Sequence, residues 1–295
     1  DYNADSDGAI SLSGGTISTN GGNITMGGGS GAITAGSGFA VGNSTYGCGV
    51  YVGDTLNAAA GSIIINGRGY NSGGSPGIQV GGVIIAAGAG DITLTGVGGL
   101  STSSFNIGVQ LLGVGSIVHN GAGTLNIIGT GGGSGGAGNA MGIYNAGTIR
   151  TTSTGQMVLL GYGGTGSGGS NYGLRSDGTI SATGSGNILI KASSGGTAGL
   201  YLPYATGIST ASGNITVFAD NISLSNANNI NAWGTLTIAA YSNGSVGVGG
   251  VEPRRRLVEK QRLAVRICPY LAESSGKLHA PLFSARKAGV NSVVE

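Results

Sequence analysis

The chain has 295 residues, of which 65 are glycine, 39% are hydrophobic and only 8% are charged, and its formal net charge is +2. An ordinary soluble domain carries ~7% glycine and ~25% charged residues, so this composition excludes one. General disorder is also disfavoured, because disordered chains are poor in β-branched residues, whereas Ile, Val and Thr recur along this chain. No run approaches the ~18 consecutive apolar residues of a membrane helix, and we predict no transmembrane segment.

The composition divides the chain at one point. Residues 1–250 contain 63 of the 65 glycines, four basic residues, seven aspartates and no glutamate. Residues 251–295 contain nine basic residues, all four glutamates and three of the five prolines. The formal charge is therefore −3 in the first part and +5 in the second. We predict a glycine-rich repeat domain over 1–250 and a separate basic tail over 251–295, both cut from a longer precursor.

The first repeats are short. The segments GAISLSG, GTISTNG, GNITMGG and GAITAGS follow one another within residues 8–37. Each has the alternation of apolar and polar residues that is typical of a strand. Their close spacing predicts shorter coils here than in the rest of the chain.

Longer repeats follow from residue 61. Segments that resemble one another begin at Gly61, Gly90, Gly123, Gly155, Gly186 and Gly213, at separations of 29, 33, 32, 31 and 27 residues. Each contains two apolar residues two positions apart, namely Ile63/Ile65, Ile92/Leu94, Leu125/Ile127, Met157/Leu159, Ile188/Ile190 and Ile215/Val217. This period of two places one set of side chains inward, such as Ile188, and the intervening set outward, such as Thr93.

Each long repeat contains two more strand signals. The middle one reads GIQVGG, GVQLLG, GIYNAG, YGLRSDG and GLYLPY in turn. The late one has isoleucine at 84, 117, 149 and 180, and Ile208 falls within one residue of the same place. One such unit cannot bury its apolar face alone, but stacked copies can. We therefore predict an all-β fold, a parallel β-helix of about seven or eight coils, with ~4.8 Å per coil.

The last repeat carries a resemblance to a known family. The run GNITVFADNISLSNANNINAWGTLTIAAY from Gly213 resembles the units of filamentous-haemagglutinin-like and autotransporter-like β-strand-repeat adhesins of Gram-negative bacteria. The resemblance covers roughly residues 8–250 and implies a rigid stalk of a secreted or cell-surface protein. It also implies an outer-membrane export partner and attachment to glycans or proteins of a host or neighbouring cell. We predict no nucleic-acid partner.

Catalytic chemistry is not indicated. The only acids across residues 61–250 are Asp91, Asp177 and Asp220, and no two share a coil position, whereas glycosidases need two carboxylates about 5–9.5 Å apart. We expect Asp91 and Asp177 to bond their own turn backbone, and His119, the only histidine in residues 1–250, to lie in a turn or at the surface. The cysteines at 48 and 268 have no metal-ligand spacing. We predict a non-enzyme without metal or cofactor. The alternatives are a carbohydrate-active β-helix enzyme and an ice- or crystal-surface binder, which would need aligned outward threonines, whereas Thr93, Thr95 and Thr216 are not regular from coil to coil.

Tyrosines supply the candidate contact residues. Tyr70, Tyr162 and Tyr172 fall in glycine- and serine-rich loops, and Tyr201 and Tyr204 lie nearby in the next repeat. If the loops stack, these rings form an aromatic strip for glycans or a protein. The alternative is that each ring packs on a neighbouring coil.

The basic tail admits three interpretations. Apolar residues from Leu257 to Cys268 follow helical spacing between Pro253 and Pro269. The segment could be an amphipathic cap helix over the open end of the solenoid, or a basic patch for nucleic acid or membrane. The third interpretation is a frame-shifted or disordered segment, which the change of every compositional index at one point favours.

Overall fold

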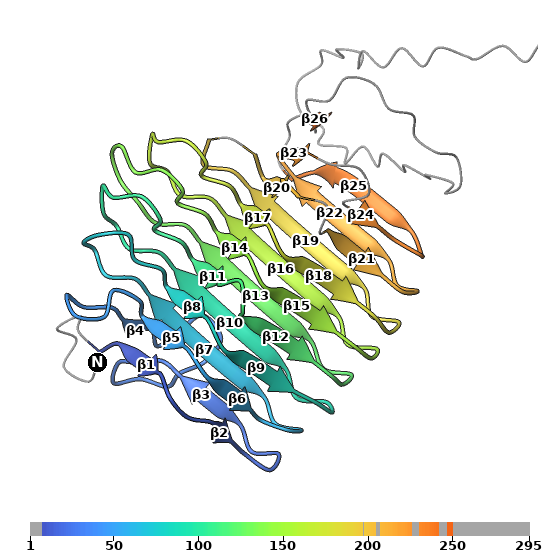
Figure 1. Ribbon diagram of the computed structural model, residues 1–295, viewed down its shortest axis with the longest axis horizontal. Helices are drawn as coiled ribbons and strands as arrows, with labels where there is room; N and C mark the ends of the chain where they lie inside the picture. Colours follow the sequence, from blue (N-terminus) through green and yellow to red (C-terminus); the bar gives the residue numbers. More distant parts are fainter. Residues whose placement is uncertain (1–7, 197, 205–206, 226–229, 242–246, 250–295) are drawn as a thin grey trace, which may run out of the picture.

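A computed structural model describes residues 8–196, 198–204, 207–225, 230–241 and 247–249. All of the regular structure in these residues is β-strand, and neighbouring strands in each sheet pair in parallel. The strands wind into a β-solenoid, which confirms the predicted fold class (Figure 1). The basic tail, residues 251–295, lies outside the described residues, and so do all three interpretations of it.

The coils contribute strands to three sheets, here named A, B and C. Sheet A comprises, in spatial order, β1 (Ile10–Leu12), β5 (Val50–Val52), β8 (Ile78–Val80), β11 (Val109–Leu111), β14 (Ile143–Asn145), β17 (Leu174–Ser176), β20 (Leu200–Leu202), β23 (Asn221–Leu224) and β26 (Gly247–Gly249). Sheet B comprises β2 (Ile17–Ser18), β6 (Thr55–Asn57), β9 (Val83–Ala86), β12 (Ser116–His119), β15 (Thr148–Thr151), β18 (Thr179–Ala182), β21 (Ile208–Thr210) and β24 (Ile230–Asn231). Sheet C comprises β3 (Ile24–Met26), β7 (Ile63–Arg68), β10 (Ile92–Val97), β13 (Leu125–Thr130), β16 (Met157–Tyr162), β19 (Ile188–Ser193), β22 (Ile215–Ala219) and β25 (Leu236–Ala240), and β4 (Ala40–Val41) also pairs with β7.

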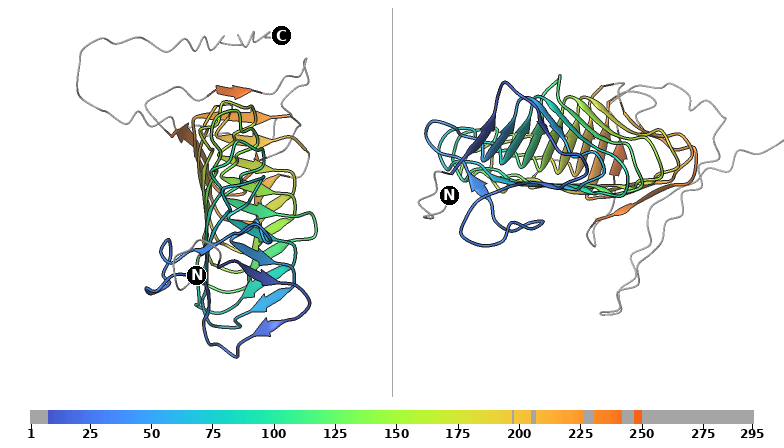
Figure 2. Two further views of the ribbon diagram at one scale, coloured as in Figure 1. Left: turned by 90° about the vertical axis from the view of Figure 1, so that its left-hand side faces the viewer. Right: turned by 90° about the horizontal axis from the view of Figure 1, so that it is seen from below.

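In the part of the chain that the structure describes there are about six regular coils from β7 to β24, and each runs through sheets C, A and B. This count of regular coils differs slightly from the predicted seven or eight, and further strands of the same three sheets, such as β5 and β25, stack on either side of them. The views in Figure 2 show the coils following one another along the rod, from the blue N-terminal strands to the orange ones.

The N-terminal repeats explain the difference. The first three of the short segments form β1, β2 and β3, which lie in sheets A, B and C. They are therefore three sides of the solenoid rather than separate short coils. The fourth segment forms a turn, in which Thr34 and Ser37 make an antiparallel bridge. This turn belongs to an insertion, so that Ile24 and its sheet partner Ile63 are 39 residues apart and the local coil is longer than the others, not shorter.

The apolar core consists of columns of side chains inside the coils. Sheet C provides the two columns that the sequence predicts, since Ile63 pairs with Ile92 and Ile65 with Leu94, and the register continues to β22. Sheet B provides a column of Leu56, Ile84, Ile117, Ile149, Ile180 and Ile208, all at most 1% exposed. Each buried aliphatic side chain contributes ~1.5–3 kcal/mol, and these columns are the main source of stability.

The variable repeat length lies in the loops between sheets C and A. These loops cover residues 69–77, 98–108, 131–142 and 163–173 in the middle coils, and then shorten to residues 194–199 and to Asp220 alone. In Figure 1 the longer loops project side by side from one edge of the rod. Strand pairing is kept while the loops vary, because the strands rather than the loops hold the register.

Glycine is required where a loop returns across the end of a sheet C strand. A Cβ on Gly129, in β13, would overlap the carbonyl oxygen of Gly142. Gly67, Gly96 and Gly161 occupy the equivalent place in neighbouring strands. The chain can pass this closely only where no side chain intervenes.

The outward residues of sheet C are more covered than the sequence indicates. Thr93 alternates with the inward Ile92 and Leu94 as expected, but it is only 9% exposed. Leu189, in the equivalent column of β19, is half-buried and alternates with two inward isoleucines. The inward assignment of Ile188, 1% exposed, is confirmed.

Candidate binding face

A single column of outward side chains runs along sheet A. In strands β5, β8, β11, β14, β17 and β20 the middle residue points away from the core, because the residues on either side of it are buried. The register places these side chains next to one another in the order Tyr51, Gln79, Gln110, Tyr144, Arg175 and Tyr201. We call this set the sheet A column. Adjacent members are separated by the strand spacing of ~4.8 Å.

Arg175 is the centre of the C-terminal half of the column. Its guanidinium carbon lies 5.3 Å from the ring centroid of Tyr144 and 5.6 Å from that of Tyr201. Distances below ~6 Å are those of a cation–π contact. The guanidinium therefore fills the interval between two aromatic rings that the strand pairing places two strands apart.

A carboxylate fixes this arginine. Arg175 donates from Nε and from Nη2 to the two carboxylate oxygens of Asp177, both at 2.8 Å. The hydroxyl of Tyr144 donates to Oδ2 of the same carboxylate at 2.9 Å. A two-point bond of this kind holds the plane of the guanidinium in one orientation and compensates its charge.

The protonation states follow from these contacts. Burial, and after it the hydrogen bond to Asp177, raise the pKa of the Tyr144 phenol. The hydrogen bond to Asp177 raises the pKa of Arg175. At neutral pH the group therefore presents a neutral phenol and a charged guanidinium that is balanced by its carboxylate.

The structure brings together some of the five predicted tyrosines. The ring of Tyr172 stacks on that of Tyr201, with centroids 4.6 Å apart and planes 25° apart. Tyr204 is 54% exposed and lies close enough to Tyr144 to affect its pKa. Tyr144 itself was missed, although the middle-strand repeats GIYNAG, YGLRSDG and GLYLPY place it in line with Arg175 and Tyr201.

The other two tyrosines lie elsewhere. Tyr162 ends β16 and makes an edge-on contact with Tyr241, with ring centroids 6.3 Å apart. The backbone N–H of Tyr70 bonds to the carbonyl of Gly47. The predicted strip of five rings is therefore only partly formed, because Tyr162 lies on a strand of sheet C and Tyr201 on a strand of sheet A, whereas Tyr70 and Tyr172 lie in loops of different length.

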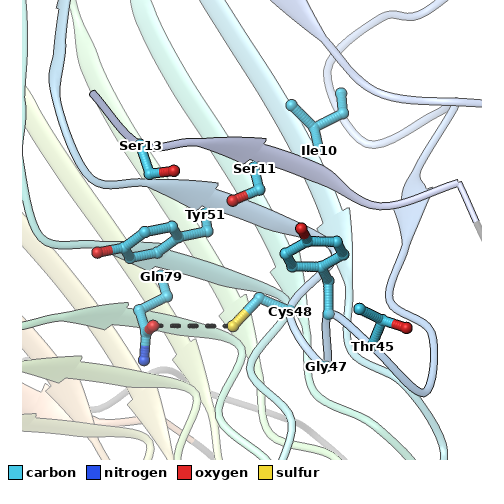
Figure 3. Close-up of a pocket in the computed structure, with 9 residues that line it drawn as sticks. Ile10, Ser11, Ser13, Thr45, Gly47, Cys48, Tyr51 and Gln79 are labelled. Atoms are coloured by element: carbon cyan, nitrogen blue, oxygen red, sulfur yellow. Dashed lines mark hydrogen bonds between the residues drawn. The ribbon is translucent and has the colours of Figure 1, made fainter. Parts of the chain in front are cut away.

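The N-terminal half of the column ends at a hollow of about 400 Å³ (Figure 3). Tyr51, Gln79, Cys48 and Ser11 line it, together with Ile10, Ser13, Thr45, Tyr46 and Gly47. The amide of Gln79 accepts a bond from the Cys48 thiol at 3.8 Å and donates to Gln110 at 2.8 Å. Burial raises the pKa of Cys48 to about 11, so this thiol is neutral at physiological pH.

Tyr51 lies along the surface of sheet A. A Cβ on Gly53 would be 2.8 Å from Cε1 of Tyr51, and a Cβ on Gly81 would be 3.4 Å from its hydroxyl oxygen. Gly53 therefore leaves room for the ring to lie against the backbone, and Gly81 lies in ordinary contact distance of its hydroxyl. The aromatic surface at this end is flat rather than projecting.

The acidic residues of the middle coils have separate tasks. Oδ1 of Asp91 accepts a bond of 2.7 Å from the backbone N–H of Thr124, in the next coil, rather than from its own turn as expected. The carboxylate of Asp177 accepts hydrogen bonds from Arg175 and Tyr144, so its role also goes beyond the expected bond to its own turn backbone. Asp220 accepts from the backbone N–H of Ser194. Within the described residues, no group of three His, Cys, Asp or Glu side chains could hold a metal ion.

The expectation for His119 was wrong. This residue ends β12, faces inward two positions after Ile117, and is fully buried. Its Nε2 lies 2.6 Å from the carbonyl oxygen of Gly90, and its Nδ1 accepts the N–H of Gly121 at 3.2 Å. A nitrogen that accepts a backbone N–H carries no proton, so the proton is assigned to Nε2. His119 therefore ties one turn to the preceding coil.

Comparisons with known protein families, with curated proteins and with solved structures find no match to this chain. Among the residues that the structure describes, no helix is long and apolar enough to cross a membrane.

Proposed function

We propose that this chain is a rigid, non-enzymatic stalk segment of a large exported surface adhesin, of the filamentous-haemagglutinin-like or autotransporter-like kind. The observation that carries the proposal is the continuous register of the sheet C columns from β7 to β22. A strand that is bonded to both neighbours cannot bend without breaking ladder bonds, so a stack of such coils is stiff. Each added coil lengthens it by ~4.8 Å.

The proposal includes a place and partners. A stalk of this kind is secreted to the cell surface of a Gram-negative bacterium through an outer-membrane export partner. It holds its contact surfaces away from the cell, toward glycans or proteins of a host or neighbouring cell. The repeat resemblance from Gly213 onward and the low charge of the coils support this assignment.

The alternatives receive less support. A carbohydrate-active enzyme needs paired carboxylates, whereas the aspartates at 91, 177 and 220 bond to different partners at different corners. An ice-surface binder needs a regular threonine array, but in sheet C the neighbours of Thr93 are Ile64 and Asn126.

The experiment is immunogold labelling of intact cells that produce this chain, with an antibody against residues 61–225. We expect labelling without permeabilisation, its loss after external protease, and reduced attachment of the cells in the presence of the purified chain. Labelling that requires permeabilisation would refute the surface assignment.

A further inference from the structure

We propose that Asn120 is a self-modification site, at which the backbone nitrogen of Gly121 attacks the side-chain amide and ammonia is released. His119 acts as the base, and the hydroxyl of Thr152 stabilises the oxygen of the attacked carbonyl. This proposal is independent of the stalk function, because it rests only on contacts within one corner of the solenoid.

The reacting groups belong to an Asn–Gly pair. The nitrogen that follows an asparagine can close a small ring on the side-chain carbonyl carbon, and glycine presents no side chain that would hinder this approach. Asn120 is exposed, so its amide nitrogen can leave into water. The sequence contains such pairs at Asn20, Asn66, Asn120 and Asn243, of which Asn243 lies outside the described residues.

A base is aimed at the attacking nitrogen. The N–H of Gly121 donates to Nδ1 of His119 at 3.2 Å, and Nε2 of the same ring lies 2.6 Å from the carbonyl oxygen of Gly90. The contact with Gly90 holds the tautomer in which Nδ1 keeps a free lone pair, as an orienting group does for the histidine of a hydrolase. Because His119 is fully buried, bulk water does not compete for this lone pair.

The attacked carbonyl has a hydrogen-bond donor. The hydroxyl of Thr152, in the next coil, donates to Oδ1 of Asn120 at 3.0 Å. Negative charge develops on this oxygen when the nitrogen adds to the carbonyl carbon, and a donor that is already in place stabilises the charge. A nucleophile, its base, an orienting group for the base and a donor for the oxyanion are therefore gathered around one side chain.

Neighbouring coils turn the same corner without a histidine. The strand register pairs His119 with Ala86 in the preceding coil and with Thr151 in the next one. The chain follows the same path in these coils, since the N–H of Asn120 bonds to the carbonyl of Ala86 and the N–H of Thr152 to the carbonyl of His119. Small residues therefore suffice at this place, and the packing of the corner does not by itself account for an imidazole.

The reaction needs only water as a co-reactant. As the bond between the Gly121 nitrogen and Cγ of Asn120 forms, the proton of that nitrogen passes to Nδ1 of His119. The imidazole then returns the proton to Nδ2, which leaves as ammonia when the Cγ–Nδ2 bond breaks. Water adds to one of the two carbonyl carbons of the cyclic imide, and the ring nitrogen takes back a proton. The product is an aspartate at position 120, linked either normally or through its β-carbon, so a neutral amide becomes a negative carboxylate.

The experiment is incubation of the purified full chain at neutral pH in heavy-oxygen water, followed by proteolysis and mass spectrometry of each Asn–Gly peptide. The other pairs are controls in the same sample, because Asn20 is exposed after β2, whereas Nδ2 of Asn66 donates to the carbonyls of Thr34 and Ser37 at 2.6 and 2.7 Å. We expect Asn120 to react about tenfold or more faster in the folded chain than in the same chain unfolded in guanidinium chloride. Asn20 should react at similar rates in both states, and folding should protect Asn66.

Substitutions at two positions separate the donor from the base. Thr152→Val removes the hydroxyl at nearly constant volume and should slow the reaction by about tenfold, whereas Thr152→Ser keeps the hydroxyl and should stay within about twofold of the native rate. His119→Gln should lower the rate in the folded chain to that of the unfolded chain. Thermal unfolding reports whether each variant is folded, and the two Thr152 variants decide the outcome if His119→Gln is not.

Three results would each overturn the proposal. The first is a rate at Asn120 in the folded chain that is no higher than in the unfolded chain. The second is equal rates in the Thr152→Val and Thr152→Ser variants. The third is cleavage of the main chain after Asn120 in place of the conversion of its amide to an acid.

Discussion

The side chain of Asn171 accepts a hydrogen bond of 2.9 Å from the backbone N–H of Ala140, which lies 31 residues earlier in the chain. The same amide donates to the carbonyls of Gly166 and Gly168 in its own loop. Asn106 repeats this arrangement with Ser75 and with the carbonyls of Ser101 and Ser103. A buried asparagine therefore closes a loop and ties it to the preceding coil.

We expect Asn171→Ala to destabilise the protein by ~1–3 kcal/mol, because it leaves buried backbone groups without partners. Asn126→Ala, on the outer face of β13, is the control and should change stability by less than ~0.5 kcal/mol. Urea unfolding measures both values. Hydrogen exchange should show the loss of protection concentrated in residues 135–170, and equal destabilisation by the two variants would contradict the role of the loop asparagine.

The alternation along β19 provides a second test on adjacent residues. Ile188 is 1% exposed and faces the core, whereas Leu189 faces outward and is half-buried. Ile188→Asp buries an unpaired charge and should cost more than ~4 kcal/mol, and the coils around β19 should melt first. Leu189→Asp should keep a single thermal transition close to the native one. Thr93 is a poorer outward control than the sequence suggests, because neighbouring groups cover it to 9% exposure.

The close approach of loop and strand at Gly129 can be tested by adding one methyl group. Gly129→Ala forces Cβ into the carbonyl oxygen of Gly142 and should destabilise by ~1–3 kcal/mol. Gly136→Ala lies in the same loop, and its Cβ would meet no atom within 4 Å. We expect that control to be neutral or slightly stabilising in calorimetry. A Gly129→Ala protein as stable as the control would show that the loop does not pass this closely.

The raised pKa of Cys48 predicts a pH dependence. Burial raises the pKa of this thiol from an ordinary 9.0 to about 11. A group whose pKa is higher in the folded protein contributes stability that is complete below about pH 9 and is lost as the pH rises through about 11. In a Cys268→Ser background, the rate of iodoacetamide alkylation should keep rising up to about pH 11 in the folded chain. In urea the unfolded chain should give a rate that levels off near pH 9, the ordinary pKa of the thiol. The same behaviour in the folded chain would contradict the burial of this thiol.

The strands could be predicted from the sequence, and the site only in part. A period of two within strands and of about thirty between them specifies columns such as Ile84, Ile117 and Ile149, because parallel pairing brings equivalent residues together. The same alignment could have identified Tyr144 beside Arg175, whereas Asp177 follows the end of β17 and its contact with Arg175 depends on the path of the turn.

Loop geometry could not be predicted in the same way. The loops between sheets C and A differ in length from coil to coil, so Tyr70 and Tyr172 occupy different places in their loops, and Tyr162, which was expected in such a loop, is the last residue of β16. The burial of His119 also depends on the path of the preceding turn at Gly90. The sequence repeat determines which strand residues pair with one another, whereas contacts between loops depend on how the loops pack in three dimensions.

The most direct test of the whole account is the distance between spin labels on outward positions of one sheet C column, in a chain without its native cysteines. One label replaces Ile64 and the other replaces Val158, Leu189 or Thr216, which lie three, four and five strands away. The parallel solenoid predicts narrow distributions near ~14, ~19 and ~24 Å, rising by ~4.8 Å per coil. Distances that are broad, or that do not increase in equal steps from one coil to the next, would contradict the in-register stack.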